Sequence, residues 1–190
     1  TVVAISELIE YYKGIFTTLS SCASRQLEEV TFRRATISVP ELMATAGKYF
    51  RKVYKGNKAH IDFKIQPLEG RITGDWNQLR FLLENLIDEA CSVTLDGAVC
   101  LSAREDGEFI RFLFTDMRRE KTREELNQLF YPDLSRMTAG EKGELYGTEY
   151  LVCKQIIRDH DEFAGRRGCR INAEPGKEGG FTIYFTLPKK

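Results

Sequence analysis

The sequence predicts an α+β fold, a two-layer sandwich in which helices cover one face of a mixed β-sheet, with a long helix at the N-terminus. Stretches with apolar residues at helical spacing alternate along the chain with short segments in which every second residue is apolar. Two of these segments are joined by Asp106-Gly107, a dipeptide typical of an antiparallel hairpin. Helices that alternate with antiparallel strand pairs are typical of two-layer α+β domains.

The composition is that of an ordinary globular chain. The 190 residues carry 28 Lys+Arg and 28 Asp+Glu, and 42% of them are hydrophobic. A core can form at this size without metals or disulfides. The balanced charge argues against a nucleic-acid or anionic-membrane binder, which would normally show a basic surplus. No stretch approaches the ~20 apolar residues of a membrane span, so we expect no membrane contact by this segment.

The five cysteines indicate free thiols rather than disulfides or a zinc site. Their number is odd and no two have C-x-x-C spacing. Buried free thiols are typical of a reducing compartment, so we expect a cytoplasmic location. The chain begins at Thr1 without an initiator methionine, and a helical pattern is already present by Ile5. We therefore expect a fragment of a larger protein.

Residues 1–34 form the first predicted unit, a single long helix. Its apolar positions alternate by four and three, which is the 3.5-residue period of a coiled coil. The positions that follow this period are Ile5, Ile9, Tyr12, Phe16, Leu19, Ala23, Gln26 and Val30. We expect one half of a dimerising hairpin, and the alternative is a helix that packs on its own domain.

Residues 35–190 form the second predicted unit, which opens with a short strand over residues 36–39. Ser38 and Glu41 have capping-box spacing and predict the start of a helix that ends near Gly56-Asn57. Residues 60–66 alternate cleanly, which predicts a half-buried strand. A short strand over residues 71–73 follows, and Asp75 is suited to cap the next helix.

The helix after Asp75 carries apolar residues at helical spacing up to Ala90, and this stripe is expected to face the core. Residues 99–103 and 109–114 predict the two strands of the hairpin. Residues 138–146 are rich in glycine and charge and predict a loop, and a helix over residues 147–160 comes next. Residues 169–172 and 179–187 predict a terminal hairpin.

Several kinds of active site are excluded by missing motifs. The chain has no G-x-S-x-G, H-E-x-x-H or Walker A motif, which removes the support for hydrolase and P-loop functions. His60 and His160 are far apart and lack metal-ligand spacing, so each is expected to be a surface or structural residue.

The order of the remaining motifs resembles a known family. The motifs are Asn85 on the helix after Asp75, Asp116 at the end of the hairpin, Gly147 at a helix start, and the terminal run 174–188, E-P-G-K-x-G-G-x-x-x-x-F-x-L-P. Over residues 36–188 the chain resembles the catalytic domain of bacterial sensor histidine kinases, of the family shared with gyrase, Hsp90 and MutL. The resemblance implies a Bergerat-type fold with ATP and Mg²⁺ as cofactors.

The resemblance also implies roles for residues on the first helix of the site. The family has two Asn residues four apart, of which the second holds Mg²⁺ between the phosphates. Asn85 matches the first, whereas Glu89 stands at the second, and Ser92 stands where a phosphate-binding Lys is common. A carboxylate can ligate Mg²⁺, so Glu89 is the candidate metal ligand.

Two further motifs match in part. Asp116 matches the Asp that recognises the adenine amino group in a D-x-G-x-G motif, but Arg118 and Glu120 replace the glycines. Gly147 matches the first glycine of a phosphate-binding helix start, and Glu149 replaces the second. The candidate nucleotide-binding residues are therefore Asn85, Glu89, Asp116 and Gly147.

These substitutions in the family motifs predict a degenerate nucleotide site. Glu89 and Glu149 would place carboxylates toward the phosphates, and each like-charge contact costs about 4 kcal/mol at ~4 Å and an effective dielectric constant of ~20. A basic run of Arg118, Arg119, Lys121 and Arg123 follows Asp116. It either supplies compensating charge or forms a solvated surface, and the second is the usual outcome.

Three functional hypotheses follow. The first is a degenerate domain of a two-component sensor histidine kinase, which binds ATP weakly or not at all and acts through dimerisation and partner contacts. The second is an active histidine kinase domain in which Glu89 ligates Mg²⁺. The third is a phosphotransfer or scaffold protein that docks a response-regulator receiver domain. In the family the phosphoacceptor His lies on an earlier helix, so this fragment cannot autophosphorylate alone, and no catalytic residue is assigned.

Overall fold

The computed structural model describes residues 32–56, 58–131 and 149–190, together with six helical positions between residues 5 and 16. Its elements are, in order, β1 (Ala35–Ser38), α2 (Val39–Val53), β2 (Ile61–Gln66), β3 (Arg71–Gly74), α3 (Trp76–Cys91), β4 (Gly97–Asp106), β5 (Phe109–Asp116), α4 (Arg123–Gln128), α5 (Glu149–Phe163), β6 (Ile171–Pro175) and β7 (Phe181–Pro188).

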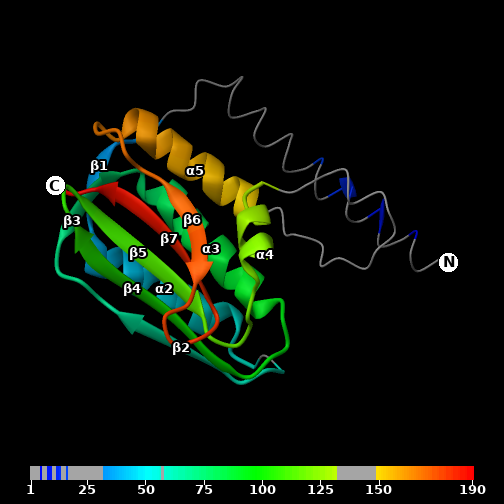
Figure 1. Cartoon of the computed structure of the whole chain (residues 1–190). Coiled ribbons are helices and arrows are strands. Elements are labelled where there is room, and N and C mark those ends of the chain that lie inside the picture. Colours follow the sequence, from blue (N-terminus) through cyan, green and yellow to red (C-terminus); the bar gives the residue numbers. More distant parts are fainter. Residues whose placement is uncertain are drawn as a thin grey trace.

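The main sheet has five strands in the order β2-β4-β5-β7-β6 (Figure 1). β2 pairs with β4 in parallel, and the other neighbours pair antiparallel, so the predicted mixed sheet is confirmed. The two predicted hairpins, β4–β5 and β6–β7, are both formed. β1 and β3 instead form a separate antiparallel pair, which the sequence did not indicate.

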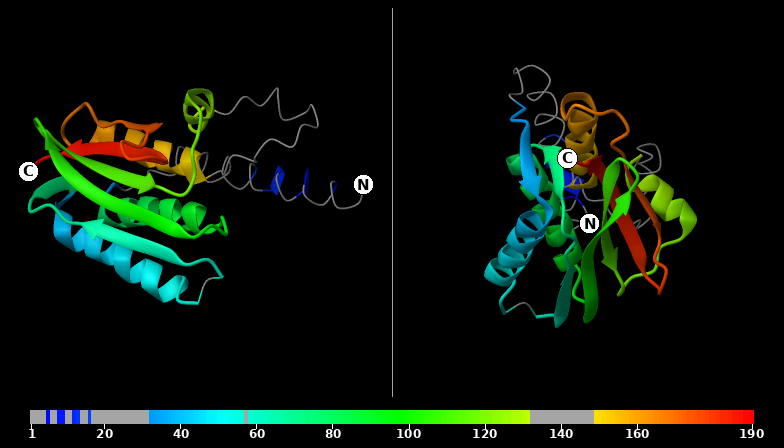
Figure 2. Two further views of the ribbon diagram at one scale, coloured as in Figure 1. Left: turned by 60° about the horizontal axis from the view of Figure 1, so that its bottom comes forward. Right: turned by 90° about the vertical axis from the view of Figure 1, so that its left-hand side faces the viewer.

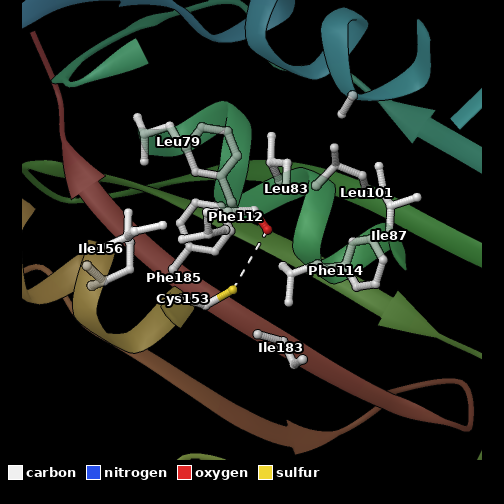
Figure 3. Close-up of a cluster of buried hydrophobic side chains, with 14 of the residues drawn as sticks. Leu79, Leu83, Ile87, Leu101, Phe112, Phe114, Cys153, Ile156, Ile183 and Phe185 are labelled. Carbon is white, nitrogen blue, oxygen red and sulfur yellow. Dashed lines mark hydrogen bonds between the residues drawn. The ribbon is translucent and has the colours of Figure 1, made fainter. Parts of the chain in front are cut away.

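Helices α2, α3 and α5 cover one face of the main sheet (Figure 2), so the predicted two-layer sandwich is confirmed. The apolar stripe of α3 faces inward as expected, and Leu79, Leu83 and Ile87 are at most 1% exposed. They pack with Phe112 and Phe185, whose rings stack at 5.0 Å between centroids (Figure 3). Alternate residues of β5 are buried, which gives this strand one face toward the helices.

The helix starts follow the predicted capping chemistry in part. Asp75 caps α3 by accepting from the amide of Gln78 at 3.1 Å. Ser38 caps α2 by accepting from the amide of Glu41 at 3.4 Å, which is one half of the predicted capping box. The complete capping box occurs at α4, between Thr122 and Glu125. This short helix was not predicted, although its T-R-E-E sequence carries the signal.

Several predicted features lie outside the described residues: most of the long N-terminal helix, the loop over residues 138–146, and Gly147. The described positions between residues 5 and 16 are helical, as predicted. Cys91, Cys100 and Cys169 carry free thiols and are half-buried, whereas Cys153 is buried, so the expectation of buried thiols holds for Cys153 alone among these four. Within the described part, no helix is both long and apolar enough to cross a membrane.

His160 connects the residues just before β1 to the hydrophobic core. Its ring is fully buried, with Nδ1 2.8 Å from the carbonyl of Ile156 and Nε2 accepting from the amide of Asp75 at 3.0 Å. The Phe32 ring meets it edge-on at 4.8 Å, and the Asp75 carboxylate accepts from the Arg33 amide at 2.9 Å. Because Nε2 must accept a bond, the imidazole is neutral, and burial lowers the pKa of His160.

We expect the free energy of unfolding to fall as the pH drops below about 6.5, the pKa of histidine in an unfolded chain. In that range the unfolded chain binds a proton that the folded chain excludes. Urea denaturation at a series of pH values measures the effect. His60→Asn, which removes an exposed histidine, should retain this dependence, and His160→Asn should weaken it. An unchanged dependence in His160→Asn would contradict the assignment.

Candidate functional site

The end of α3, the turn after β5 and the first turn of α5 meet at the candidate site. Glu89 from α3 and Asp116 from β5 come together there because Arg119 forms ion pairs with both. Asn85 lies one helical turn before Glu89, and its side-chain amide donates to the carbonyl of Phe81 at 3.0 Å. Gly147, the fourth candidate, lies outside the described residues, and so does the side chain of Glu149.

The carboxylate of Asp116 is buried and fully hydrogen-bonded. It is 1% exposed, and it accepts four hydrogen bonds from two arginines. Oδ1 accepts from the amide and Nε of Arg118 at 3.0 and 2.9 Å. Oδ2 accepts from the Arg118 Nη2 and the Arg119 Nε at 2.8 and 3.0 Å. A carboxylate offers about four lone-pair sites, so none is left for a ligand.

The electrostatics of Asp116 follow from these contacts. Burial by itself would raise the pKa of the carboxyl group, because it disfavours the charged form. The hydrogen bonds from Arg118 and the positive charges of Arg119 and Arg118 outweigh burial and lower the pKa of Asp116 overall. The carboxylate is therefore ionised at neutral pH and is held by its own chain.

Arg118, at the position of the first family glycine, points into the domain. Its side chain is 1% exposed. Besides Asp116, the guanidinium donates to the carbonyls of Ala90 at 2.6 Å, Leu95 at 3.0 Å and Val93 at 3.5 Å. The Ala90 carbonyl belongs to the last turn of α3, where carbonyls lack helical partners and attract positive charge.

Arg119 neutralises the candidate metal ligand. Its Nη2 and Nη1 atoms donate to the two carboxylate oxygens of Glu89 at 3.0 and 3.3 Å. The guanidinium lies 5.4 Å from the centroid of the Phe181 ring, at the start of β7. Burial would lower the pKa of Arg119, but the hydrogen bond and charge of Glu89 raise it overall. The solvated-surface interpretation is thus wrong for Arg118 and Arg119, whereas Arg123 is exposed.

Tyr150 is a further residue at the site, and the sequence did not indicate it. It lies in the first turn of α5 and is 1% exposed, and its hydroxyl has no hydrogen-bond partner in the described structure. Burial raises the pKa of Tyr150, and the negative charge of Glu89 raises it further, so the hydroxyl keeps its proton. A lone Tyr after a glycine-rich stretch carries no sequence signal for this position.

The residues present do not fit an adenine nucleotide and Mg²⁺ held in the way that the resemblance implies. The carboxylate of Asp116, which the resemblance makes the candidate for adenine recognition, accepts four bonds from its own chain. Both oxygens of Glu89 are paired with Arg119. Within the ranges that the structure describes, no group of three or more His, Cys, Asp or Glu side chains is arranged to hold a metal ion.

Comparison with known proteins gives a match to one family. Residues 74–190 match the family described as histidine kinase-, DNA gyrase B-, and HSP90-like ATPase. The adaptive-response sensory kinase SasA of Thermosynechococcus vestitus is 30% identical over 138 residues, which are 71% of this chain and 34% of that protein. The chain thus spans about a third of the length of this relative.

Solved structures share the fold. Full-length ShkA in complex with AMPPNP superposes with a TM-score of 0.68 at 18% identity, over 99% of this chain and 38% of that one. The histidine kinase AdeS of Acinetobacter baumannii gives 0.65 at 12% identity, over 98% and 83%. The nucleotide-free catalytic domain of ThkA gives 0.62 at 18% identity, over 83% and 96%. Since the family match covers more than half of its residues, the chain belongs to the histidine kinase-, DNA gyrase B-, and HSP90-like ATPase family.

Proposed function

We propose that this chain is a signalling domain of the sensor histidine kinase type that does not bind ATP at its family site and acts through dimerisation and contacts with a partner. The observation that carries the proposal is the Asp116 carboxylate, which two arginines of the same chain saturate with four hydrogen bonds. The remaining support comes from Glu89, from the exposed apolar positions described between residues 5 and 16, and from the relatives.

An energetic comparison favours the arginines over adenine at Asp116. A hydrogen bond from the adenine amino group to the carboxylate would contribute roughly 1.5–3 kcal/mol. To accept it, Asp116 would release a bond from Arg118 or Arg119, whose side chains are 1% and 11% exposed. Breaking a buried ion pair costs roughly 3–5 kcal/mol, because the remaining charge stays unpaired. The exchange is therefore unfavourable.

The same reasoning disfavours the alternative in which Glu89 ligates Mg²⁺. The metal would have to displace Arg119 from both carboxylate oxygens, and Arg119 also pairs with Asp116. The guanidinium would then lose both of its bonds to Glu89 while its Nε stays bonded to Asp116. Glu89 and Arg119 are 16% and 11% exposed, so water compensates this loss only in part.

We expect no saturable binding of ATP with Mg²⁺ at millimolar nucleotide in isothermal titration calorimetry. The melting temperature should not rise either, because only a ligand that binds the folded state stabilises it; the gain is about 2.7 kcal/mol at 100 times the Kd. ShkA, whose structure holds AMPPNP, is the positive control in the same buffer. A saturable, Mg²⁺-dependent heat from the present chain would refute the proposal.

We expect the stability of the folded chain to depend on Asp116. We expect Asp116→Ala to lower the free energy of unfolding by about 3–5 kcal/mol, because it leaves two arginines without their buried partner. Asp106→Ala is the matched control, since Asp106 is 40% exposed and pairs with Arg111, and it should cost at most about 1 kcal/mol. Urea denaturation compares them, and equal costs would argue against this role.

The N-terminal helix supports the dimerisation part of the proposal. Its described apolar positions are exposed: Ile5 58%, Leu8 47%, Ile9 49%, Tyr12 56% and Phe16 74%. Ile5, Ile9, Tyr12 and Phe16 are four, three and four residues apart, and Leu8 lies beside Ile9, so all five lie along one face of a helix. Such a face is costly to leave in water. We propose that residues 1–34 pair with a second copy and that residues 35–190 form the family domain.

We expect the chain to sediment as a dimer at micromolar concentration, and Ile9→Glu with Phe16→Glu to convert it to a monomer. Two carboxylates in the apolar seam would be desolvated without a partner. Val53→Glu introduces the same charge at a residue of α2 that is 50% exposed, and it should leave the dimer intact. A dimer that survives the double substitution would disprove pairing through this helix.

A response-regulator receiver domain is the partner that we propose. The support is that ThkA, which shares the fold at 17% identity and a TM-score of 0.65, has been solved in complex with the response regulator TrrA. Neither His60 nor His160 lies within residues 1–34. The helix present here therefore supplies no phosphoacceptor histidine, which favours docking over phosphotransfer as the role of this segment.

A further inference from the structure

We infer that the position where the family recognises adenine has become a binding site for guanidinium in this chain, and that Arg118 is its intramolecular ligand. The inference deepens the proposed function and rests on it. It names the class of ligand that the site binds, whereas the proposed function states only that the site does not bind ATP.

The hydrogen-bond pattern selects guanidinium. The group has five N–H donors in one plane and no acceptor. The site supplies five matching acceptor contacts, from both carboxylate oxygens of Asp116 and the carbonyls of Ala90, Val93 and Leu95. Adenine would satisfy a carboxylate with its amino group, but its ring nitrogens need donors. A site lined by acceptors alone leaves these ring nitrogens buried without donors, which is unfavourable.

The charge of the site favours a cation. Asp116 and Glu89 together carry two negative charges, and Arg118 and Arg119 balance them through the ion pairs already described. Without Arg118, one negative charge would remain in a buried site beside the last turn of α3, whose carbonyl end adds partial negative charge. The negative potential of the site stabilises a small planar cation, whereas it does not stabilise a neutral base.

Two glycines leave room for the aliphatic part of the Arg118 side chain and for the turn that carries it. A Cβ on Gly97 would lie 2.8 Å from Cγ of Arg118, and Gly97 has a φ of +135° that side chains rarely adopt. A Cβ on Gly180 would collide with the Asp116 carbonyl oxygen, and its φ is +69°. Because neither glycine carries a side chain, the backbone at both positions can pack directly against Arg118 and the turn before it. The Arg118 side chain is therefore buried and does not lie on the surface.

The first test uses the wild-type chain and therefore needs no variant to fold. NMR detects the Nε–H of each arginine, assigned through its own Cδ, and measures its exchange with water. Arg118 Nε–H, bonded to Asp116 at 2.9 Å, should exchange at least about tenfold more slowly than that of the exposed Arg123. Equal exchange of the two would overturn the inference.

The second test replaces the ligand. In Arg118→Ala, guanidinium chloride at about ten times its Kd should raise the melting temperature by roughly 3–6 °C above a NaCl control of equal ionic strength. Urea, which has the same planar shape without the charge, should not. Arg111→Ala, which removes a guanidinium from the pair with the 40% exposed Asp106, should show no rescue. A folded Arg118→Ala that adenosine stabilises and guanidinium does not would overturn the inference.

Adding ATP and Mg²⁺ to the NMR sample separates this inference from the proposed function. Nucleotide binding with Arg118 still protected would contradict the proposed function alone. Rapid exchange of Arg118 without nucleotide binding would contradict the guanidinium site alone. Loss of protection on nucleotide binding would contradict both, because it would show that adenine displaces the arginine.

Discussion

The buried negative charge of Asp116 is the constraint on which the arrangement of the site depends. An isolated carboxylate cannot remain ionised in a dry interior without a partner, because its desolvation costs several kcal/mol. This chain places Asp116 at the end of a central strand, 1% exposed, and meets the charge with the two arginines that follow it. The turn after β5 therefore folds back over its own carboxylate instead of opening toward a ligand.

That compensation ties several elements together. Arg118 connects the β5 turn to the last turn of α3 and to the segment before β4. Arg119 connects the same turn to Glu89 on α3 and lies over Phe181 on β7. Two arginines and two carboxylates close the region with no net charge. Glu89 and Asp116, two of the candidate nucleotide-binding residues, thus form ion pairs that hold these elements together.

The fold was largely predictable, and the site was predictable only in part. The alternation in β5, the stripe on α3 and the Asp75 cap are local patterns, and each appears in the structure as expected. The separate pairing of β1 with β3 was missed, since short strands of four residues do not indicate their partners. Helix α4 was missed because a helix of six residues has too few turns to show a periodic apolar face.

The sequence by itself determined the order of the strands and of the longer helices, the family, and the position of Asp116 at a strand end, because these follow from periodicity and motif spacing. Only the tertiary structure decided that Arg118 and Arg119 are buried and paired with carboxylates. A run of charged residues after a strand has no period and is usually solvated. Burial of these arginines requires acceptors at Glu89, Ala90 and Leu95, more than 20 residues earlier in the chain. The fold alone brings those acceptors within hydrogen-bond distance, and electrostatics then fixes the two side chains inside.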